Sequence, residues 1–416
     1  MNEQDETTPP CGPLAGLKVI DMTTSYAGPT ASMYLADLGA DVIKVERPGS
    51  GDDARTWGPP FVQDASAWFA SANRNKRSVV INLREREGLA TLRRLIGSAD
   101  VFMENLNPGK LAKLGIGHER LRAEFPRLIY CAMSGFGLTG PDHALPGYDL
   151  AAQARSGIMS VTGAKGGSPQ RVSSALSDVV TGMCAALAVS AAVVRQREHG
   201  VGELIDVSLL DSDLAVMAPR IAAYLAGERE PAPSGGTDSV LAVYQSFPTA
   251  DRDLAIAIGN DAMWRRFCDV IGVPELGAEQ ALADNAGRRA HRERLVAEVS
   301  AKLVDRTASE WIKILGEAGI PCSPVQRLSE VVADPQVTAR GSLLPVPGTE
   351  GAMHSVHSPF RLASIARPRN GRFPELGAHT VEVLDEYGFS AADIERLVAC
   401  GAVQDGDVAS TEGEPR

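Results

Sequence analysis

Paired cysteine motifs are missing from this chain of 416 residues. Its six cysteines include no CxxC pair, which excludes a zinc knuckle or a dithiol redox site of the usual spacing. Scattered cysteines are typical of proteins kept in a reducing compartment, so we expect a cytoplasmic location. The first residues, MNEQDETTPPCG, also lack the basic start and apolar stretch of a signal peptide.

Basic charge and long apolar runs are scarce as well. The 41 Lys and Arg residues are outnumbered by 52 Asp and Glu, which gives a net charge of -11. Binding to nucleic acid or to an anionic membrane needs a basic surface, so we expect neither partner. The longest apolar stretch, residues 179–194, is short for a membrane span and rich in alanine, and it predicts a buried helix instead.

Three sequence motifs of common catalytic sites are absent. The turn TTSYAGPT has one glycine where a dinucleotide-binding GxGxxG loop has three, and we interpret the nearby Glu46 as a solvated charge at a strand end. None of the seven histidines lies in an HExxH motif, and no metal is predicted. GxSxG is also absent, so the catalytic group is expected to be a carboxylate.

The sequence does contain alternating strand and helix signals. Residues 17–22 and 42–46 are apolar strand-like runs, and between them a helix is predicted from Pro29 to Gly39 by its start and stop residues. Further strands are predicted in SVVINL, DVFMEN, LIYCAMSG and GELIDVS, with a helix over 87–96. This order predicts the α/β class, with a mostly parallel sheet covered on both faces.

The middle of the chain differs in character from what precedes it. At roughly 150 residues per domain, the length predicts two or three domains. Residues 229–240 are rich in Pro, Gly and Ser and indicate a linker. Beyond them we expect a smaller domain with a strand pair and amphipathic helices over 292–304 and 308–318. Strands and turns return from about 341, followed by a helix over 391–398 and a disordered acidic tail.

Six blocks of the sequence, in order, resemble the family III CoA-transferases. They are GLKVIDMTTSYAGPTASMYLADLGADVIKVERPGSGDDARTWGPPF, NRNKRSVVINL, VFMENLNPGKLAKLGIG, MSGFGLTGP, GYDLAAQARSGIMSVTG and LSDVVTGMCAALAV. This family includes formyl-CoA, carnitine and dicarboxylate CoA-transferases, with 2-methylacyl-CoA racemases as relatives. The resemblance implies a Rossmann-like CoA-binding domain over 1–225, completed by 341–416, and a small α+β domain over 226–340. It also implies an interlocked dimer, either a homodimer or a heteromer.

The resemblance assigns the nucleophile to Asp178. In the family an aspartate at this position attacks the acyl-CoA and passes through an aspartyl anhydride and an aspartyl-CoA thioester, with coenzyme A as substrate and no tightly bound cofactor. From the residues alone, Asp178 would be interpreted as the N-cap of the helix that follows. We expect the helix N-terminus to keep its carboxylate ionised.

Further site residues follow from the same resemblance. Arg47, Arg84, Asn105 and Lys113 match positions that hold the nucleotide of CoA, whose phosphates need cations or backbone amides. Gly235 and Gly236 match a glycine-rich loop that closes over the site and excludes water.

Tyr148 stands where the racemases have a histidine, and a tyrosine is a poor base at neutral pH. The chain is therefore expected to transfer CoA rather than to racemise. Two alternatives stay open: a 2-methylacyl-CoA racemase, and the CoA-binding subunit of a heteromeric transferase.

The acceptor acid is predicted from two short blocks. GDDARTWGPPF and NRNKRS look most like those of dicarboxylate-using members such as the succinyl-CoA:glutarate CoA-transferases. This resemblance predicts a dicarboxylate acceptor, with succinyl-CoA as the donor. The second carboxylate needs a cation when the site closes, and Arg55, Arg74 and Arg171 are the candidates.

Overall fold

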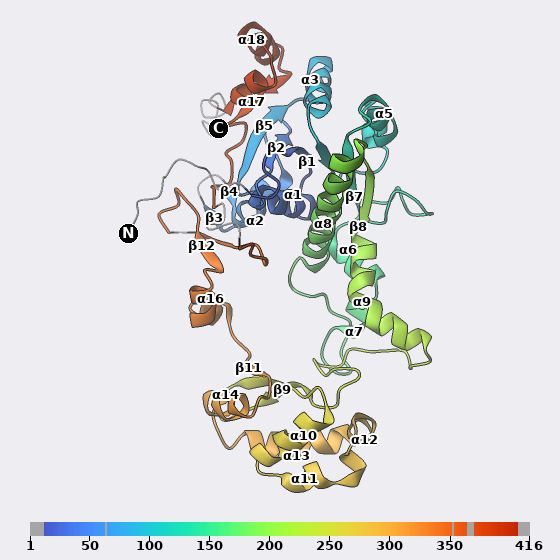
Figure 1. Cartoon of the computed structure of the whole chain (residues 1–416), viewed down its shortest axis with the longest axis vertical. Coiled ribbons are helices and arrows are strands. Elements are labelled where there is room, and N and C mark those ends of the chain that lie inside the picture. Colours follow the sequence, from blue (N-terminus) through green and yellow to red (C-terminus); the bar gives the residue numbers. More distant parts are fainter. Residues whose placement is uncertain (1–11, 63–64, 352, 364–369, 407–416) are drawn as a thin grey trace. The chain divides into compact units, whose positions relative to one another are not determined.

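A computed structural model describes residues 12–62, 65–351, 353–363 and 370–406 (Figure 1). The expected acidic tail beyond 406 lies outside the described residues. The chain divides into two compact units. The first contains the chain up to Gly157, Val172–Ala223 and the chain from Ala339, and the second contains Ile158–Arg171 and Tyr224–Thr338.

This grouping differs from the expected domain boundaries at one segment. Ile158–Arg171, which lies within the range 1–225 expected for the large domain, belongs to the second unit. The backbone explains the grouping, because the N–H of Gly235 donates a hydrogen bond of 2.9 Å to the carbonyl oxygen of Gly163.

A seven-stranded sheet forms the centre of the first unit, in the order β14-β5-β2-β1-β6-β7-β8 (Figure 1). Every pair is parallel except the edge pair of β14 with β5. Without β14, this is the strand order of a doubly wound Rossmann-like sheet, which confirms the predicted class. The strands are β1 (Lys18–Met22), β2 (Asp41–Glu46), β5 (Lys76–Ile81), β6 (Val101–Glu104), β7 (Ile129–Ser134), β8 (Leu204–Ser208) and β14 (Val403–Gln404).

Neighbouring residues of each strand face opposite layers, as the pleat of a strand requires. Val19 and Met103 pack into the core shared with α1 (Ala27–Asp37) and α8 (Leu176–His199). Ile20 and Phe102 pack into the opposite core, which is shared with the following helices: α3 (Arg86–Gly97), α5 (His118–Glu124), α17 (Thr380–Glu386) and α18 (Ala391–Ala399). The sheet is therefore covered on both faces, as predicted.

The long apolar helix α8 is buried on one side. By length and composition it could cross a membrane. In the first unit, however, it packs against α1 so closely that a Cβ added at Gly182 would lie 2.9 Å from the carbonyl oxygen of Ala27. Leu187 and Val194, on the same helix, are 72% and 65% exposed. The prediction of a buried helix is therefore confirmed for one face only.

Shorter elements complete the first unit. They are η1 (Asp53–Thr56), β3 (Phe61–Val62), β4 (Ala65–Ser66), α2 (Ala67–Ala72), α4 (Lys110–Lys113), α6 (Asp149–Arg155), β12 (Leu343–Pro345) and β13 (His354–Val356). Helix α9 (Leu209–Leu225) follows β8 directly, and all but its last two residues belong to this unit.

The second unit has its own sheet and its own apolar core. Three antiparallel strands are ordered β11-β10-β9, which confirms the predicted strand pair: β9 (Tyr244–Pro248), β10 (Asp253–Ala257) and β11 (Cys322–Pro324). Trp264, Phe267 and Trp311 are buried beside them. The remaining elements are α7 (Ile158–Val161), α10 (Asp261–Val270), α11 (Pro274–Ala278), η2 (Gln280–Leu282), α12 (Asn285–Ala290), α13 (Arg292–Leu303), α14 (Ala308–Glu317) and α15 (Leu328–Val331); α16 (Pro335–Ala339) spans the boundary to the first unit.

Candidate active site

Two loops meet at the carboxyl ends of β1 and β6, where the strand order of the sheet reverses. The backbone N–H of Thr24 donates to Asn105 Oδ1 at 2.9 Å, and Asn105 Nδ2 donates to the carbonyl oxygen of Thr24 at 2.8 Å. In open α/β sheets, ligands bind beside this reversal. The predicted site residue Asn105 therefore fixes the loop that follows β1.

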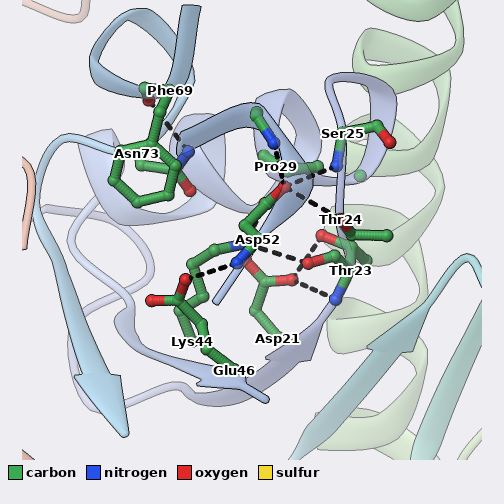
Figure 2. Close-up of polar contacts among 12 residues, drawn as sticks. Asp21, Thr23, Thr24, Ser25, Pro29, Lys44, Glu46, Asp52, Phe69 and Asn73 are labelled. Atoms are coloured by element: carbon green, nitrogen blue, oxygen red, sulfur yellow. Dashed lines mark hydrogen bonds and ion pairs between the residues drawn. The ribbon is translucent and has the colours of Figure 1, made fainter. Parts of the chain in front are cut away.

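A buried network of charges fixes the same loop from the other side (Figure 2). Asp52 pairs with Lys44 at 2.8 Å, and its Oδ1 accepts from the Thr24 hydroxyl and the Ser25 N–H, both at 2.9 Å. Burial alone would raise the pKa of Asp52, but the Lys44 charge and the hydrogen bonds that Asp52 accepts together outweigh burial and hold the pKa below its usual value. Asp21 contributes a second buried carboxylate, which accepts from the backbone N–H of Thr23 at 2.9 Å.

Glu46 and Arg55 form a buried pair next to this network. Arg55 donates two hydrogen bonds to Glu46, at 2.8 and 2.7 Å, and its guanidinium lies 3.8 Å from the ring centroid of Phe69. Glu46 is 4% exposed. The interpretation of Glu46 as a solvated charge is therefore wrong, and Arg55 is already occupied by a protein carboxylate.

Two cavities open at this edge of the sheet. The larger, of about 670 Å³, is lined by Arg47, Arg84 and Lys110 among others. The smaller, of about 270 Å³, contains Asp178. Arg47, Lys110, Thr24 and Leu106 line both cavities. A ligand with phosphates in the larger cavity and a reactive group beside Asp178 would therefore follow one continuous set of residues.

Asp178 is the third residue of α8 and not its N-cap, so the alternative interpretation as a cap is wrong. Ala175 occupies the cap position and makes no side-chain hydrogen bond. The carboxylate of Asp149, from α6, takes over that role: its Oδ2 accepts from the N–H groups of Ser177 at 2.9 Å and Asp178 at 3.4 Å. The Asp178 side chain is thus left to line the cavity.

The charge environment of Asp178 differs from the expectation. Burial raises the pKa of Asp178 to about 7, and the neighbouring carboxylates of Asp149 and Asp213 add to the shift. The helix N-terminus was expected to keep the Asp178 carboxylate ionised. That expectation left out burial and the two neighbouring carboxylates, which both raise its pKa.

Tyr148 lines the same cavity as Asp178. It is the N-cap residue of α6 and is 62% exposed. In the single chain Tyr148 is therefore not a packed core aromatic. The predicted residues Asp178, Tyr148, Arg47 and Asn105 are thus brought together in one cavity.

The expected CoA cations differ in placement. Arg47 forms an exposed ion pair with Asp53 and donates to Ser50 Oγ at 2.8 Å. Arg84 is exposed and lines the larger cavity. Lys113 is exposed and lines neither cavity, whereas Lys110, one turn earlier in α4, lines both. The motif PGKLAKLG therefore places its first lysine, and not the predicted second one, at the cavities.

Two of the three candidate cations for a distal carboxylate, Arg55 and Arg74, lie in the first unit with the cavities. Arg74 is buried, pairs with Asp37 and donates to the carbonyl oxygen of Val356 at 3.0 Å. Neither Arg74 nor Arg55 lines either cavity. Arg171 belongs to the second unit.

The glycine loop also belongs to the second unit. Gly235 and Gly236 have φ angles of 69° and 84°, a left-handed conformation that favours glycine. The hydroxyl of Ser234 donates to the carbonyl oxygen of Thr237 at 2.7 Å and closes a tight turn around the two glycines. The described segment is therefore an ordered turn in its own unit.

Comparison with known proteins decides between the families of α/β enzymes. The model of CoA-transferase family III matches residues 14–380. The chain belongs to this family. Succinate–glutarate CoA-transferase of Agrobacterium fabrum is 38% identical over 381 residues, which cover 90% of this chain and 95% of that protein. Acetyl-CoA:oxalate CoA-transferase of Acetobacter aceti is 39% identical over 342 residues, which cover 82% and 88%.

Solved structures agree with the family assignment. A CAIB/BAIF family protein from Brucella suis superposes with a TM-score of 0.79 at 36% identity, over 90% of this chain and 99% of that one. The protein is thus a CoA-transferase of family III, which confirms the resemblance seen in the sequence.

Sequence reasoning missed three residues of the site. Asp149 follows Tyr148 directly in GYDL, and an acid in the first turn of a helix could have indicated its position. Lys110 could have been found as the first lysine of PGKLAKLG. Asp213, which is fully buried in α9, gave no such signal, because its role depends on two other helices meeting it.

Proposed function

We propose that this CoA-transferase moves CoA from an acyl-CoA such as succinyl-CoA to a dicarboxylic acid, with Asp178 as the nucleophile. The observation that supports this most is the Asp178 carboxylate, which lines a cavity together with two cations, Arg47 and Lys110. The Asp178 carboxylate does not cap its own helix, because the Asp149 carboxylate accepts the hydrogen bond from the Ser177 N–H.

The reaction is built from four acyl-transfer steps. An oxygen of Asp178 attacks the thioester carbonyl, the C–S bond breaks, and CoA leaves as the thiolate while an aspartyl anhydride forms. The thiolate then attacks the aspartyl carbonyl and releases the donor acid, which leaves an aspartyl-CoA thioester. The acceptor carboxylate repeats these two steps in reverse. No net proton or electron is consumed, so the chemistry needs no redox group.

Coenzyme A is held as substrate in the larger cavity. Its pyrophosphate and 3′-phosphate carry negative charge, which Arg47, Arg84 and Lys110 would offset. Asn105 contributes by fixing the loop after β1, whose Thr24 lines both cavities. Lys113 is not included among the residues that bind CoA phosphates, because it lines neither cavity.

The acceptor is inferred from the relatives. Glutarate and oxalate, named in two of them, are both diacids. Arg55 and Arg74 could bind a distal carboxylate only by breaking a buried ion pair, which costs several kcal/mol. Arg171 stays a candidate, and Arg47 and Lys110 join it because they line the cavity of Asp178.

The dimer is also part of the proposal. Monomeric proteins rarely expose large apolar patches, and the outer face of α8 exposes Leu187 and Val194. A second chain would cover such a face, which supports the expected interlocked homodimer, with a heteromer as the alternative. The cytoplasm is the expected location. Molar mass in solution, measured by light scattering, tests the dimer: a monomer at micromolar concentration contradicts it.

The function is tested by turnover of the purified chain with a panel of acyl-CoAs and free acids. We expect a diacid to exceed the monoacid of equal length in kcat/KM by about a hundredfold, because an unpaired buried charge costs several kcal/mol. Equal rates would contradict a dicarboxylate site. With 2-methylacyl-CoA in deuterated water and no acceptor, α-proton exchange should be absent, whereas rapid exchange would establish the racemase alternative.

A further inference from the structure

Ser25 has a conformation that its own residue type does not favour. Its φ angle is 71°, in the left-handed region, where residues other than glycine are uncommon. Such a conformation costs about 1 kcal/mol or more and persists only where surrounding structure enforces it. Strained residues of this kind cluster at ligand sites, so the cause of this strain and the direction of the side chain both matter.

The enforcing structure is the buried charge network. Asp52 Oδ1 accepts from the Ser25 N–H at 2.9 Å, from the Thr24 hydroxyl at 2.9 Å and from the Ala54 N–H at 2.9 Å. Asp52 is in turn held by Lys44, which is fully buried and also donates to the carbonyl oxygen of Thr23 at 2.9 Å. The backbone of Ser25 is therefore held by groups that line no part of the Asp178 cavity themselves.

The side chain of Ser25 points away from the Asp52 carboxylate that holds its backbone. Figure 2 shows its N–H directed at Asp52 and its hydroxyl turned away from that carboxylate. Within the described part of the chain the hydroxyl makes no hydrogen bond, whereas the Thr24 hydroxyl beside it is bound to Asp52. Ser25 lines the same cavity as Asp178. The cavity thus contains the Asp178 carboxylate and the Ser25 hydroxyl on a fixed backbone, and the hydroxyls of Thr181 and Tyr148 line it as well.

Helix packing accounts for this meeting of Ser25 and Asp178. Ser25 lies two residues before α1, and the first turns of α8 lie against the first turn of α1, where Gly182 approaches the carbonyl oxygen of Ala27. Asp178 is one turn before Gly182. The loop before α1 and the start of α8 therefore border one space.

We propose that Ser25 is a further catalytic residue, whose hydroxyl donates a hydrogen bond to the acyl oxygen when Asp178 attacks the thioester. The inference rests on the proposed function of Asp178. In the attack, a C–O bond forms to Asp178 and the carbonyl electron pair moves onto oxygen. The Ser25 hydroxyl stabilises this oxyanion, keeps its proton, and is released from the contact when the C–S bond breaks. A donor held in place beforehand stabilises the transition state without reorganisation.

The test is the single-turnover rate at which Asp178 becomes acylated by acyl-CoA, measured for wild type, Ser25→Ala and Ser25→Gly. Ala removes the hydroxyl and keeps the strain, whereas Gly removes both. Both variants should acylate about a hundredfold more slowly, as expected for loss of one oxyanion donor. The dissociation constant for CoA, measured by calorimetry, should stay within about twofold of wild type, as expected if the hydroxyl acts in the transition state alone. Ser190→Ala removes a hydroxyl that is bonded within α8, to the carbonyl oxygen of Ala186, and serves as the matched control.

Each outcome separates the two claims. Absence of acylation in the wild type would overturn the proposed function. Acylation of wild type together with unchanged rates in either Ser25 variant would overturn the role of Ser25 alone. A slow Ala variant with a normal Gly variant would show that the backbone strain matters and the hydroxyl does not. Equal loss of acylation rate and CoA affinity would show a role in binding only and would also overturn the proposal.

Discussion

Replacing Asp178 by asparagine should make the folded protein more stable at neutral and higher pH. The pKa of Asp178 is about 7 in the folded chain, against an ordinary value of 3.8, because burial and two neighbouring carboxylates disfavour its charge. Between these two pH values the folded protein binds a proton that the unfolded chain has released. The wild type therefore loses stability as the pH rises through this window, while the asparagine variant has no such charge to bury.

The size of the effect follows from the shift. One pKa unit corresponds to about 1.4 kcal/mol, so the full difference of about three units has an upper limit of about 4 kcal/mol. The pKa of Asp213 is raised as well, mainly by burial, and its charge acts on Asp178, so part of the change belongs to this pair rather than to Asp178 alone. We therefore expect the variant to gain about 2 to 4 kcal/mol of unfolding free energy at pH 8. The gain should be absent below pH 3.8 and complete above pH 7.

Denaturant unfolding of both proteins at pH 5, 6, 7 and 8 measures this difference. The difference should grow with pH up to about 7 and then level off. Glu198→Gln removes one charge from the other end of α8, where Glu198 is exposed, and should leave the difference flat. A wild type that is more stable than Asp178→Asn at pH 8, or a difference independent of pH, would refute the reasoning.

Two further predictions follow from the site. Lys110→Ala should raise the KM for the acyl-CoA about tenfold with little change in kcat, because Lys110 lines both cavities. Lys113→Ala should leave both constants unchanged, because Lys113 lines neither cavity. Similar effects of the two substitutions on steady-state kinetics would support the sequence-based assignment of Lys113. Asp52→Ala should destabilise the protein by about 3 to 5 kcal/mol in denaturant unfolding, because Lys44 is left buried without its partner. The double variant Lys44→Met, Asp52→Asn keeps an amide oxygen for the donors that Asp52 accepts from, and it should recover most of that loss. An equally unstable double variant would show that the unpaired Lys44 charge was not the cause.

The fold was predictable where its signals are local. The strand, helix and second strand at the start of the chain were expected at 17–22, 29–39 and 42–46, and they lie at Lys18–Met22, Ala27–Asp37 and Asp41–Glu46. Alternating apolar residues and the Gly stop signal lie within a few positions of the elements they define. Helix α1 nevertheless begins before Pro29, since such signals mark ends only approximately. The stop signal is confirmed, because Gly39 directly follows the C-cap residue Leu38 and has a positive φ.

The pairing of charges was not predictable, because partners lie far apart in the sequence. Arg55 also donates to the carbonyl oxygen of Pro374, and Arg74 to that of Val356. From the sequence alone, Arg55 and Arg74 look available to bind a ligand. Only the folded chain shows that each is already paired with a protein carboxylate. The pKa of Asp178 was misjudged for a similar reason. Its own helix favours the anion, but burial in the folded chain raises the pKa, and Asp149 and Asp213, from two other helices, add to the shift.

The central claim is that Asp178 becomes covalently loaded, and peptide mass spectrometry tests it most directly. The wild-type chain is incubated with acyl-CoA alone, quenched with hydroxylamine and digested. We expect the peptide that contains Asp178 to gain the mass of a hydroxamate in the wild type and not in Asp178→Asn, with turnover of the variant lower by several orders of magnitude. An unmodified Asp178 peptide in an active wild type, or near wild-type turnover in Asp178→Asn, would contradict the account.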